Sequence, residues 1–232
     1  MKIFNRLEKI RNERGCVAVA LIDPDKKNDS LLCKIVSLVN DSDFDAIFIG
    51  GSLISDNEFE KRVLRVKENT DLPIIIFPGS SNQLSASADA VLFLSLISGR
   101  NPQYLIGEHV KSAPVIYNLQ LETISTAYIL LEGGKRSSVE IISNTTPLPM
   151  NKPDIIIAHA IAGQYLGNKM IFLEAGSGAV NHAETDLVSR LHECLSIPII
   201  NFFILKNEVV FFFVIMFVLI FYTHRENIKR LL

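Results

Sequence analysis

The sequence predicts an α/β protein, a modified TIM (β/α)8 barrel that is incomplete after its seventh strand. Short runs of Val, Ile and Leu alternate along the chain with longer amphipathic stretches. Such runs are typical of parallel strands that are buried on both faces. No Gly-x-Gly-x-x-Gly motif follows the first run, which disfavours a dinucleotide-binding sheet. The repetition of strand, loop and helix therefore favours a barrel.

This pattern predicts seven strands and six helices. The strands are expected at residues 17–22, 46–49, 74–77, 90–94, 127–131, 170–173 and 197–201. The helices are expected at residues 3–13, 31–39, 59–67, 102–111, 152–166 and 181–195, the last with Asn181 as its cap. Gly, Pro and Asp residues close most of the strands, as turns require.

Composition and charge exclude several classes of protein. The chain has 232 residues, 48% of them hydrophobic, which excludes a disordered chain. A net charge of −2 gives no general attraction to nucleic acid, and no nucleic acid partner is expected. Cys16, Cys33 and Cys194 are scattered without metal-type spacing, and the N-terminus has no apolar signal core. Both features predict a cytoplasmic protein.

The chain changes character near residue 200. All twelve Gly residues lie at or before Gly178, whereas seven of the fourteen Phe residues lie between Phe202 and Phe221. We therefore expect a barrel domain at residues 1–200 and a divergent apolar tail at residues 201–232. The tail holds fourteen uninterrupted apolar residues, whereas a membrane span needs about 20. A shift of reading frame near residue 201 is favoured over a membrane span or an interfacial anchor, and sequencing the DNA downstream of codon 200 tests it.

Three predicted strands end in loops whose residues suit chemistry at the reactive face of a barrel. Asp23-Pro24-Asp25-Lys26 offers carboxylates for a hard cation such as Mg²⁺, although Asp-Pro also favours an ordinary turn. Gly50-Gly51-Ser52 allows close approach of a ligand and adds a hydroxyl, and a tight turn is an equal alternative. Glu-Ala-Gly-Ser-Gly at residues 174–178 can supply backbone amides to a phosphate beside a carboxylate, or form a flexible turn.

Taken together, these loops resemble the geranylgeranylglyceryl phosphate synthase family, and its bacterial branch in particular. The resemblance rests on four motifs and their spacing, at residues 21–26, 49–52, 77–80 and 172–179. Members of that family are modified TIM barrels. They join sn-glycerol 1-phosphate to a polyprenyl diphosphate, such as geranylgeranyl diphosphate, through an ether bond and release diphosphate with Mg²⁺ as the cofactor. The resemblance therefore implies a prenyltransferase of glycerolipid synthesis with those two partners.

The resemblance also implies roles for individual residues. Asp23 and Ser52 correspond to the magnesium positions. Glu174 is the candidate carboxylate that positions or deprotonates the attacking hydroxyl. The first glycerol-phosphate segment corresponds to Phe172, Leu173, Glu174, Ala175, Gly176, Ser177 and Gly178. The family forms homo-oligomers, and the apolar tail makes peripheral membrane contact a further expectation.

Two departures from the family pattern predict weakened activity. Family members usually carry Tyr where this chain has Phe172, which removes a hydroxyl donor to the glycerol phosphate. After the seventh strand they carry two Gly-containing loops that complete the phosphate site, whereas residues 201–232 contain no glycine. The barrel is then expected to leave two unpaired strand edges. The alternatives are an inactive truncated barrel with a membrane- or partner-associating tail, and another phosphate-binding barrel enzyme such as an isomerase.

Overall fold

Seven parallel strands curl around a common axis in the computed structural model, which describes residues 1–176, 179–203 and 218–220. Each strand pairs in parallel with the next one along the chain. The strands are β1 (Ala18–Ile22), β2 (Ala46–Ile49), β3 (Ile74–Ile76), β4 (Ala90–Leu96), β5 (Glu122–Leu130), β6 (Met170–Glu174) and β7 (Ile199–Phe203). Among the described residues no parallel strand follows β7, so the predicted TIM-type barrel without its last parallel strand is confirmed.

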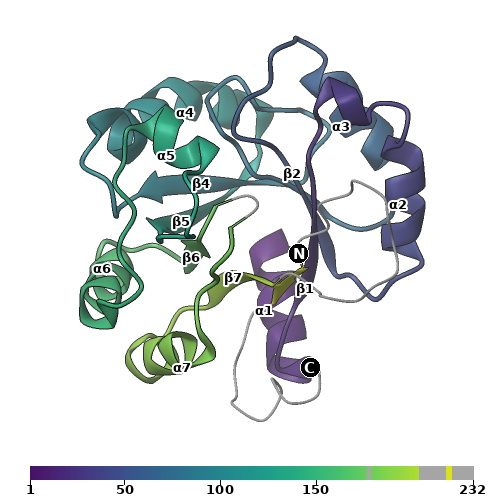
Figure 1. Ribbon diagram of the computed structural model, residues 1–232. Helices are drawn as coiled ribbons and strands as arrows, with labels where there is room; N and C mark the ends of the chain where they lie inside the picture. Colours follow the sequence, from purple (N-terminus) through teal and green to yellow (C-terminus); the bar gives the residue numbers. More distant parts are fainter. Residues whose placement is uncertain (177–178, 204–217, 221–232) are drawn as a thin grey trace.

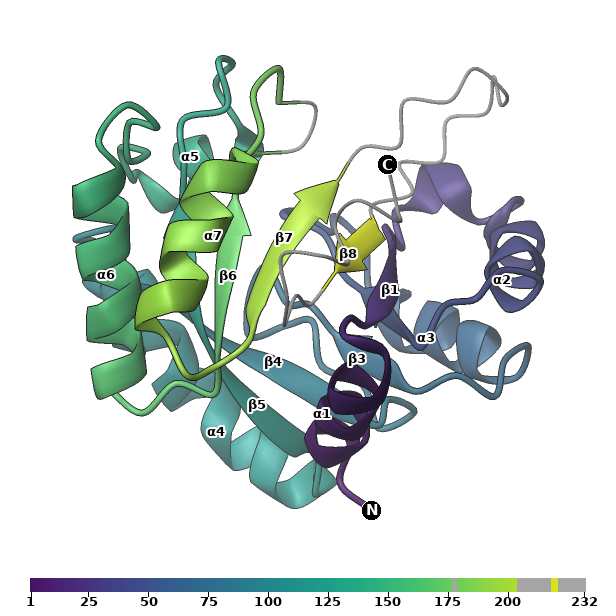
Figure 2. The same ribbon diagram turned by 90° about the horizontal axis from the view of Figure 1, so that it is seen from below.

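A three-residue strand, β8 (Val218–Ile220), lies between β7 and β1 (Figure 2). It is antiparallel to both neighbours, with Leu219 opposite Phe202 of β7 and opposite Val19 of β1. The expectation of two unpaired strand edges is therefore wrong, because β8 gives both edges a partner. Most of the predicted apolar tail lies outside the described residues, which include only residues 201–203 and 218–220 of it.

Helices surround the strands, with α2 and α3 on one side and α4 to α7 on the other (Figure 1). The α-helices are α1 (Ile3–Arg14), α2 (Leu32–Asn40), α3 (Phe59–Lys67), α4 (Glu108–Leu119), α5 (Ser138–Ser143), α6 (Pro153–Tyr165) and α7 (Thr185–Cys194). A 3-10 turn, η1 (Lys26–Asn28), follows β1, and a π-helical turn, η2 (Gln103–Gly107), leads into α4. The prediction that Asn181 caps the last helix is wrong, because α7 begins four residues later with Glu184 at its cap.

The strands separate one hydrophobic core inside the barrel from two cores outside it, because successive side chains point to opposite faces. Phe48, Ile75 and Phe172 belong to the core inside the barrel. Leu173 belongs to an outer core, where β5 to β7 pack against α6 and α7. Helix α1 closes the N-terminal end of the barrel with Leu7, which is 2% exposed. The C-terminal end of the strands is thus the end at which the predicted site loops gather.

No helix in the part of the chain that the structure describes is both long enough and apolar enough to cross a membrane. Residues 77–89, all of them described, connect β3 to β4 without a helix. The outer face of these two strands therefore lacks the helix that would normally follow β3 in a (β/α)8 barrel.

Candidate functional site

Asp23 and Ser52 lie at the C-terminal end of neighbouring strands, directly after β1 and in the loop after β2. A Cβ atom built on Gly51 would lie 2.9 Å from Oδ1 of Asp23. The Asp23 carboxylate therefore packs against the backbone immediately before Ser52. The absence of a side chain at Gly51 leaves room for that approach, so the structure brings the two predicted metal residues to one place.

The residues of this pair fit a magnesium ion that is shared with a substrate. A carboxylate and a hydroxyl are the hard oxygen ligands that Mg²⁺ prefers, and Mg²⁺ usually keeps waters and substrate phosphates as its other ligands. No group of three or more His, Cys, Asp and Glu side chains in the described residues could hold a metal. Burial raises the pKa of Asp23, while Lys27, whose Nζ lies 3.7 Å from Oδ2, opposes that rise.

The loops after β2 and β3 are locked together by close backbone packing and by a buried amide. A Cβ atom on Gly50 would lie 1.8 Å from the carbonyl oxygen of Phe77, so only glycine fits there. Gln83, which is 3% exposed, donates from Nε2 to the carbonyl of Gly51 at 2.8 Å. Its Oε1 accepts from the amides of Gly79 at 3.1 Å and Gly51 at 3.4 Å. Gln83 thereby fixes the backbone beside Ser52.

Glu174 ends β6 as a buried carboxyl group, 7% exposed. Its Oε1 accepts a hydrogen bond from the amide of Gly176 at 2.6 Å. Burial raises the pKa of Glu174 to about 8, although the Gly176 hydrogen bond acts in the opposite direction. Burial also raises the pKa of Tyr128, and the nearby charge of Glu174 adds to that rise. A carboxyl group with a pKa near neutrality is suited to accept a proton from a substrate hydroxyl.

The predicted glycerol-phosphate segment divides between the inside and the outside of the barrel. The ring of Phe172 is fully buried inside, 5.1 Å from the Tyr128 ring, centroid to centroid, and edge-on to Phe77 at 5.2 Å. Leu173 packs in the outer core, and Ala175 presents its carbonyl to Gly133. The amide of Gly176 is engaged by Glu174. Ser177 and Gly178 lie outside the described residues.

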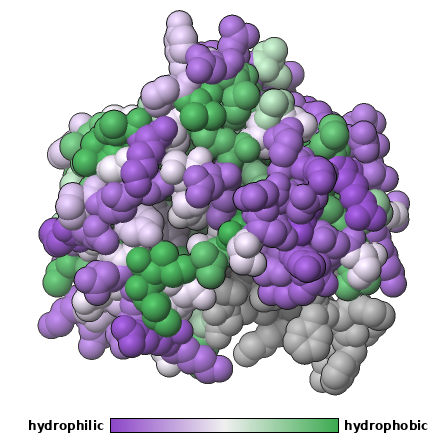
Figure 3. Space-filling model, turned by 90° about the horizontal axis from the view of Figure 1, so that it is seen from above, coloured by the Kyte–Doolittle hydropathy of each residue, from purple (hydrophilic) through white to green (hydrophobic). Residues whose placement is uncertain are grey.

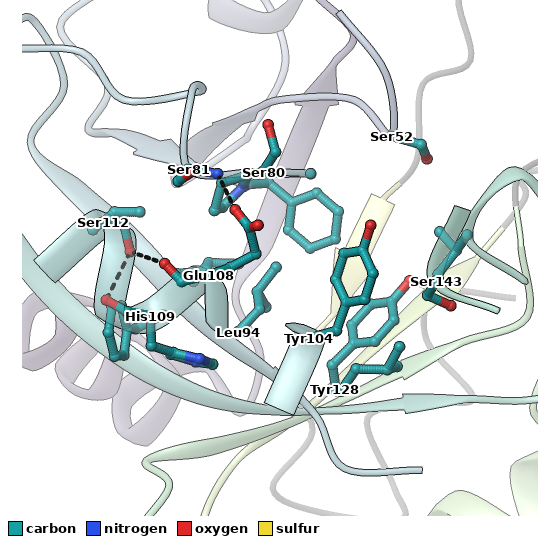
Figure 4. Close-up of a pocket in the computed structure, with 18 of the residues that line it drawn as sticks. Ser52, Ser80, Ser81, Leu94, Tyr104, Glu108, His109, Ser112, Tyr128 and Ser143 are labelled. Carbon is teal, nitrogen blue, oxygen red and sulfur yellow. Dashed lines mark hydrogen bonds between the residues drawn. The ribbon is translucent and has the colours of Figure 1, made fainter. Parts of the chain in front are cut away.

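An apolar pocket that is partly open to solvent begins beside Ser52 and runs between β4 and α4 (Figure 4). Its walls come mainly from β4, the loop after β3, the π-helical turn η2 and α4. Most of its walls are hydrocarbon, including the side chains of Phe77, Leu84, Leu92, Leu94 and Ile116. Seen from above the view of Figure 1, the surface of the molecule is mostly hydrophilic, with separate hydrophobic patches (Figure 3).

Comparison with known proteins identifies the family. The sequence model of the PcrB family matches residues 8–201. The geranylgeranylglyceryl phosphate synthase of Chitinophaga pinensis is 44% identical over 200 residues, which cover 86% of this chain and 79% of that relative. The relative of the same name from Flavobacterium johnsoniae is 43% identical over 194 residues, with 84% and 79% covered. The chain belongs to the PcrB family.

Solved structures agree with this assignment. The (S)-3-O-geranylgeranylglyceryl phosphate synthase of Thermoplasma acidophilum, solved in complex with sn-glycerol-1-phosphate, has a TM-score of 0.81 and 31% identity. The match covers 87% of this chain and 81% of that one. A synthase from Thermoplasma volcanium gives the same TM-score and identity, with 87% and 80% covered. This PcrB-family chain is therefore a member of a family of enzymes, and its barrel is the barrel of that family.

Sequence reasoning did not single out several polar residues that line the pocket of this PcrB-family chain. Tyr104, Tyr128 and Ser143 lie at the end near Ser52, and Glu108 lies on the opposite side of Leu94 (Figure 4). Tyr104 comes from the π-helical turn, Tyr128 from β5 and Ser143 from the C-terminus of α5. No local motif links these three elements, because they meet only through the closure of the barrel.

The far end of the pocket contains a second polar group of residues. His109 is 7% exposed and its Nε2 lies 3.0 Å from Oγ of Ser95. Burial lowers the pKa of His109. Glu108 accepts a hydrogen bond from the amide of Ser81 at 2.7 Å, which holds the loop after β3 against α4. These contacts fix the shape of the pocket wall.

Proposed function

We propose that this chain transfers a polyprenyl group, such as geranylgeranyl, from its diphosphate to the 3-hydroxyl of sn-glycerol 1-phosphate. The observation that carries the proposal is one end of the barrel where three features meet. These are an Asp23–Ser52 pair suited to Mg²⁺, the buried carboxyl of Glu174, and an apolar pocket that begins beside Ser52. The names of the relatives and the sn-glycerol-1-phosphate in the Thermoplasma acidophilum structure support the same substrates.

The reaction exchanges one carbon–oxygen bond for another. The bond between C1 of the prenyl chain and the diphosphate oxygen breaks, and an ether bond forms between C1 and the glycerol oxygen. Glu174 in its carboxylate form accepts the proton that the hydroxyl releases. Asp23 and Ser52 would hold Mg²⁺, which would supply positive charge to offset the negative charge that develops on the departing diphosphate. The barrel loops hold the two reactants in contact, which supplies the gain from proximity and orientation.

The apolar pocket is the proposed site of the prenyl chain. Each methylene group that leaves water for such a pocket contributes about 0.8 kcal/mol. The pocket starts at Ser52, where the diphosphate would lie, and its hydrocarbon walls continue past Leu94 toward Ile116. In this proposal one continuous surface therefore contacts both the diphosphate and the prenyl chain of the substrate.

A product assay tests the proposal directly. The full-length chain is incubated with radiolabelled sn-glycerol 1-phosphate, geranylgeranyl diphosphate and Mg²⁺, and labelled ether lipid is extracted. Product is expected, at a rate below that of the Chitinophaga pinensis relative, because residues 201–232 contain none of the glycines of the second phosphate loops. A rate equal to that relative contradicts the expected impairment. Binding of both substrates without product favours the inactive truncated barrel.

Filling the pocket tests the role assigned to it. The change Leu94→Trp adds an indole to the centre of the pocket, where Leu94 is only partly buried. We expect the KM for geranylgeranyl diphosphate to rise by about tenfold or more, since a few lost methylene contacts are worth over 1.4 kcal/mol. The affinity for sn-glycerol 1-phosphate, measured by calorimetry, should stay unchanged. An unchanged KM for the diphosphate contradicts the assignment of the pocket to the prenyl chain.

Restoring the family's tyrosine tests the glycerol-phosphate segment. The change Phe172→Tyr adds a hydroxyl to a ring that is fully buried. If that hydroxyl reaches the glycerol phosphate, the affinity should improve by about tenfold or more, because a hydrogen bond to a charged group is worth about 1.5–3 kcal/mol. Calorimetric titration with sn-glycerol 1-phosphate measures it. A loss of stability without any gain in affinity shows instead that the hydroxyl is buried without a partner.

Three further parts of the proposal concern the setting of the enzyme. The described cysteines Cys16, Cys33 and Cys194 are unpaired, which supports a reducing compartment such as the cytoplasm. Peripheral contact with a membrane is part of the proposal because the proposed product and one substrate are lipids. Self-association is part of it because the resemblance to the family implies a homo-oligomer. Light scattering of the purified chain and co-sedimentation with lipid vesicles test these two points.

A further inference from the structure

Arg62 lies on α3, outside the residues that face the pocket, and is buried between the two loops that carry Asp23 and Ser52. It is 4% exposed, which is unusual for a guanidinium group and requires that its charge be paired. Its partners are Asp29, six residues after Asp23, and Asp56, four residues after Ser52. One side chain of α3 therefore touches both loops.

Each carboxylate binds the guanidinium through two hydrogen bonds. Toward Asp29, Nε donates at 2.5 Å and Nη2 at 3.0 Å. Toward Asp56, Nη1 and Nη2 both donate at 2.7 Å. Bidentate pairs of this kind fix direction as well as distance, which a lysine ammonium cannot do. The position of one carboxylate is thus set relative to the other.

Further hydrogen bonds carry this constraint from Asp29 to the first loop. Asn28, the neighbour of Asp29, donates from Nδ2 to the carbonyl oxygen of Asp23 at 2.9 Å. Arg65 donates to the carbonyl oxygen of Asp29 at 2.9 Å. Asp23, whose side chain is proposed to bind the metal, is therefore connected to the guanidinium of Arg62 through Asn28 and Asp29.

The second loop is held at both of its ends. Asp56 binds Arg62 at one end and accepts from the amide of Glu58 at 3.2 Å, at the start of α3. The buried Gln83 holds Gly51 at the other end. Ser52 lies between these two anchors, and the pKa of Asp56 is lowered to about 2, mainly by the Arg62 hydrogen bonds, so the anchor stays charged at neutral pH.

We propose that Arg62 is a positioning residue that sets the separation of Asp23 and Ser52 for the magnesium–diphosphate group. This inference rests on the proposed function, since it assumes that these two residues share a metal with the substrate. Arg62 itself touches neither substrate nor metal. Arg62 acts through Asp29 and Asp56. Its loss should weaken the binding of magnesium pyrophosphate more than the loss of an ordinary ion pair on the same helix does.

The test compares Arg62→Met with Lys67→Met in the full-length chain. Lys67 is also on α3 and pairs with Asp89 at 2.7 Å, but Asp89 precedes β4 at the opposite end of the barrel. Calorimetry with magnesium pyrophosphate is the readout of binding. Loss of a supporting contact to a metal ligand commonly weakens binding by about 10- to 100-fold, and we expect this range for Arg62→Met. Lys67→Met should stay within about twofold of the parent, as a distant ion pair would.

Two further variants separate positioning from stability. Arg62→Lys keeps the charge but cannot form both bidentate pairs, so binding should remain about tenfold weaker. The triple variant Arg62→Met with Asp29→Asn and Asp56→Asn removes the unpaired carboxylates and should recover thermal stability. If its pyrophosphate affinity recovers as well, the proposal is overturned. If stability returns while affinity does not, positioning is supported.

Hydrogen exchange provides a readout that needs no ligand. Amides at residues 23–29 and 50–58 should exchange faster in Arg62→Met and at the parental rate in Lys67→Met. If the parent chain binds no magnesium pyrophosphate, the proposed metal site fails and the inference fails with it. If the parent binds and Arg62→Met binds equally well with unchanged exchange, only the inference fails.

Discussion

Replacing Glu174 with Gln is expected to lower kcat by about 10²- to 10⁴-fold, the usual contribution of a general base. The change keeps the size of the side chain and the hydrogen bond from the Gly176 amide to Oε1, which is 2.6 Å long in the parent. Because the geometry is preserved, the KM for sn-glycerol 1-phosphate should change little. Glu132→Gln is the matched control, since Glu132 is an exposed carboxylate just after β5 on the same end of the barrel. A Glu174→Gln enzyme with near-parental turnover contradicts the assigned role.

The kcat/KM of the parent enzyme should rise with pH and should not fall again. The pKa of Glu174 is raised to about 8, so most of this group carries a proton at neutral pH before substrate binds. Only the carboxylate can accept the hydroxyl proton. The value of kcat/KM should therefore rise with pH and level off above about pH 8, because it reports the ionisation of the free enzyme. A profile that is flat from pH 6 to pH 9 is the result that excludes Glu174 as the base.

Stability should change with pH in the opposite direction. The pKa of Glu174 is about 8 in the folded chain, against an ordinary value of 4.5. Between those pH values the folded state holds a proton that the unfolded chain has released, so stability falls as pH rises. Gln cannot ionise and escapes this loss. We expect the free energy of unfolding of Glu174→Gln, relative to the parent, to improve by about 4 kcal/mol between pH 4 and pH 8. Urea unfolding at both pH values measures it.

Most strands were predictable because each one is a continuous apolar run that closes at a turn residue. The strand at Ala46–Ile49 and the helix at Phe59–Lys67 have the predicted bounds. Strand β5 begins at Glu122, five residues before its predicted start, because the Thr and Ser residues in that part hide the strand from a search for continuous apolar runs. Helix α4 continues to Leu119 through Pro114, where sequence rules favour an earlier end. Tertiary packing sets the start of β5 and the end of α4, and local propensity alone does not predict either boundary.

The residues of the site fall into two similar groups, those that the sequence alone can place and those that it cannot. Asp23, Ser52 and Glu174 each follow or end a strand, so the sequence alone places them at one end of a barrel. Arg62 and Gln83 act on those loops from α3 and from the helix-free segment, and their partners are 4 to 33 residues away along the chain. Nothing in the local sequence marks a surface-type arginine as buried. Such contacts follow from the closure of the sheet and require the fold to be known.

Replacing Gly50 with Ala is expected to destabilise the chain by about 3 kcal/mol or more, among the larger effects of a single substitution. The new methyl group would lie 1.8 Å from the carbonyl oxygen of Phe77, and a backbone atom cannot move aside without shifting the loop after β3. Ser52 is two residues further along and Gly79 abuts the carbonyl of Gly51, so the metal pair should be lost together with stability. Thermal unfolding and calorimetry with magnesium pyrophosphate measure the two effects.

Gly167→Ala is the informative control, because it separates lack of space from backbone strain. Gly167 has φ of +85° and no heavy atom within 4 Å of a new Cβ, so alanine there meets strain alone. That strain costs about 1–2 kcal/mol for an L-residue in the left-handed region. Gly50 has no positive φ and meets only the steric clash. If the two variants unfold at the same temperature and both bind magnesium pyrophosphate, the close packing of the β2 and β3 loops does not govern the site.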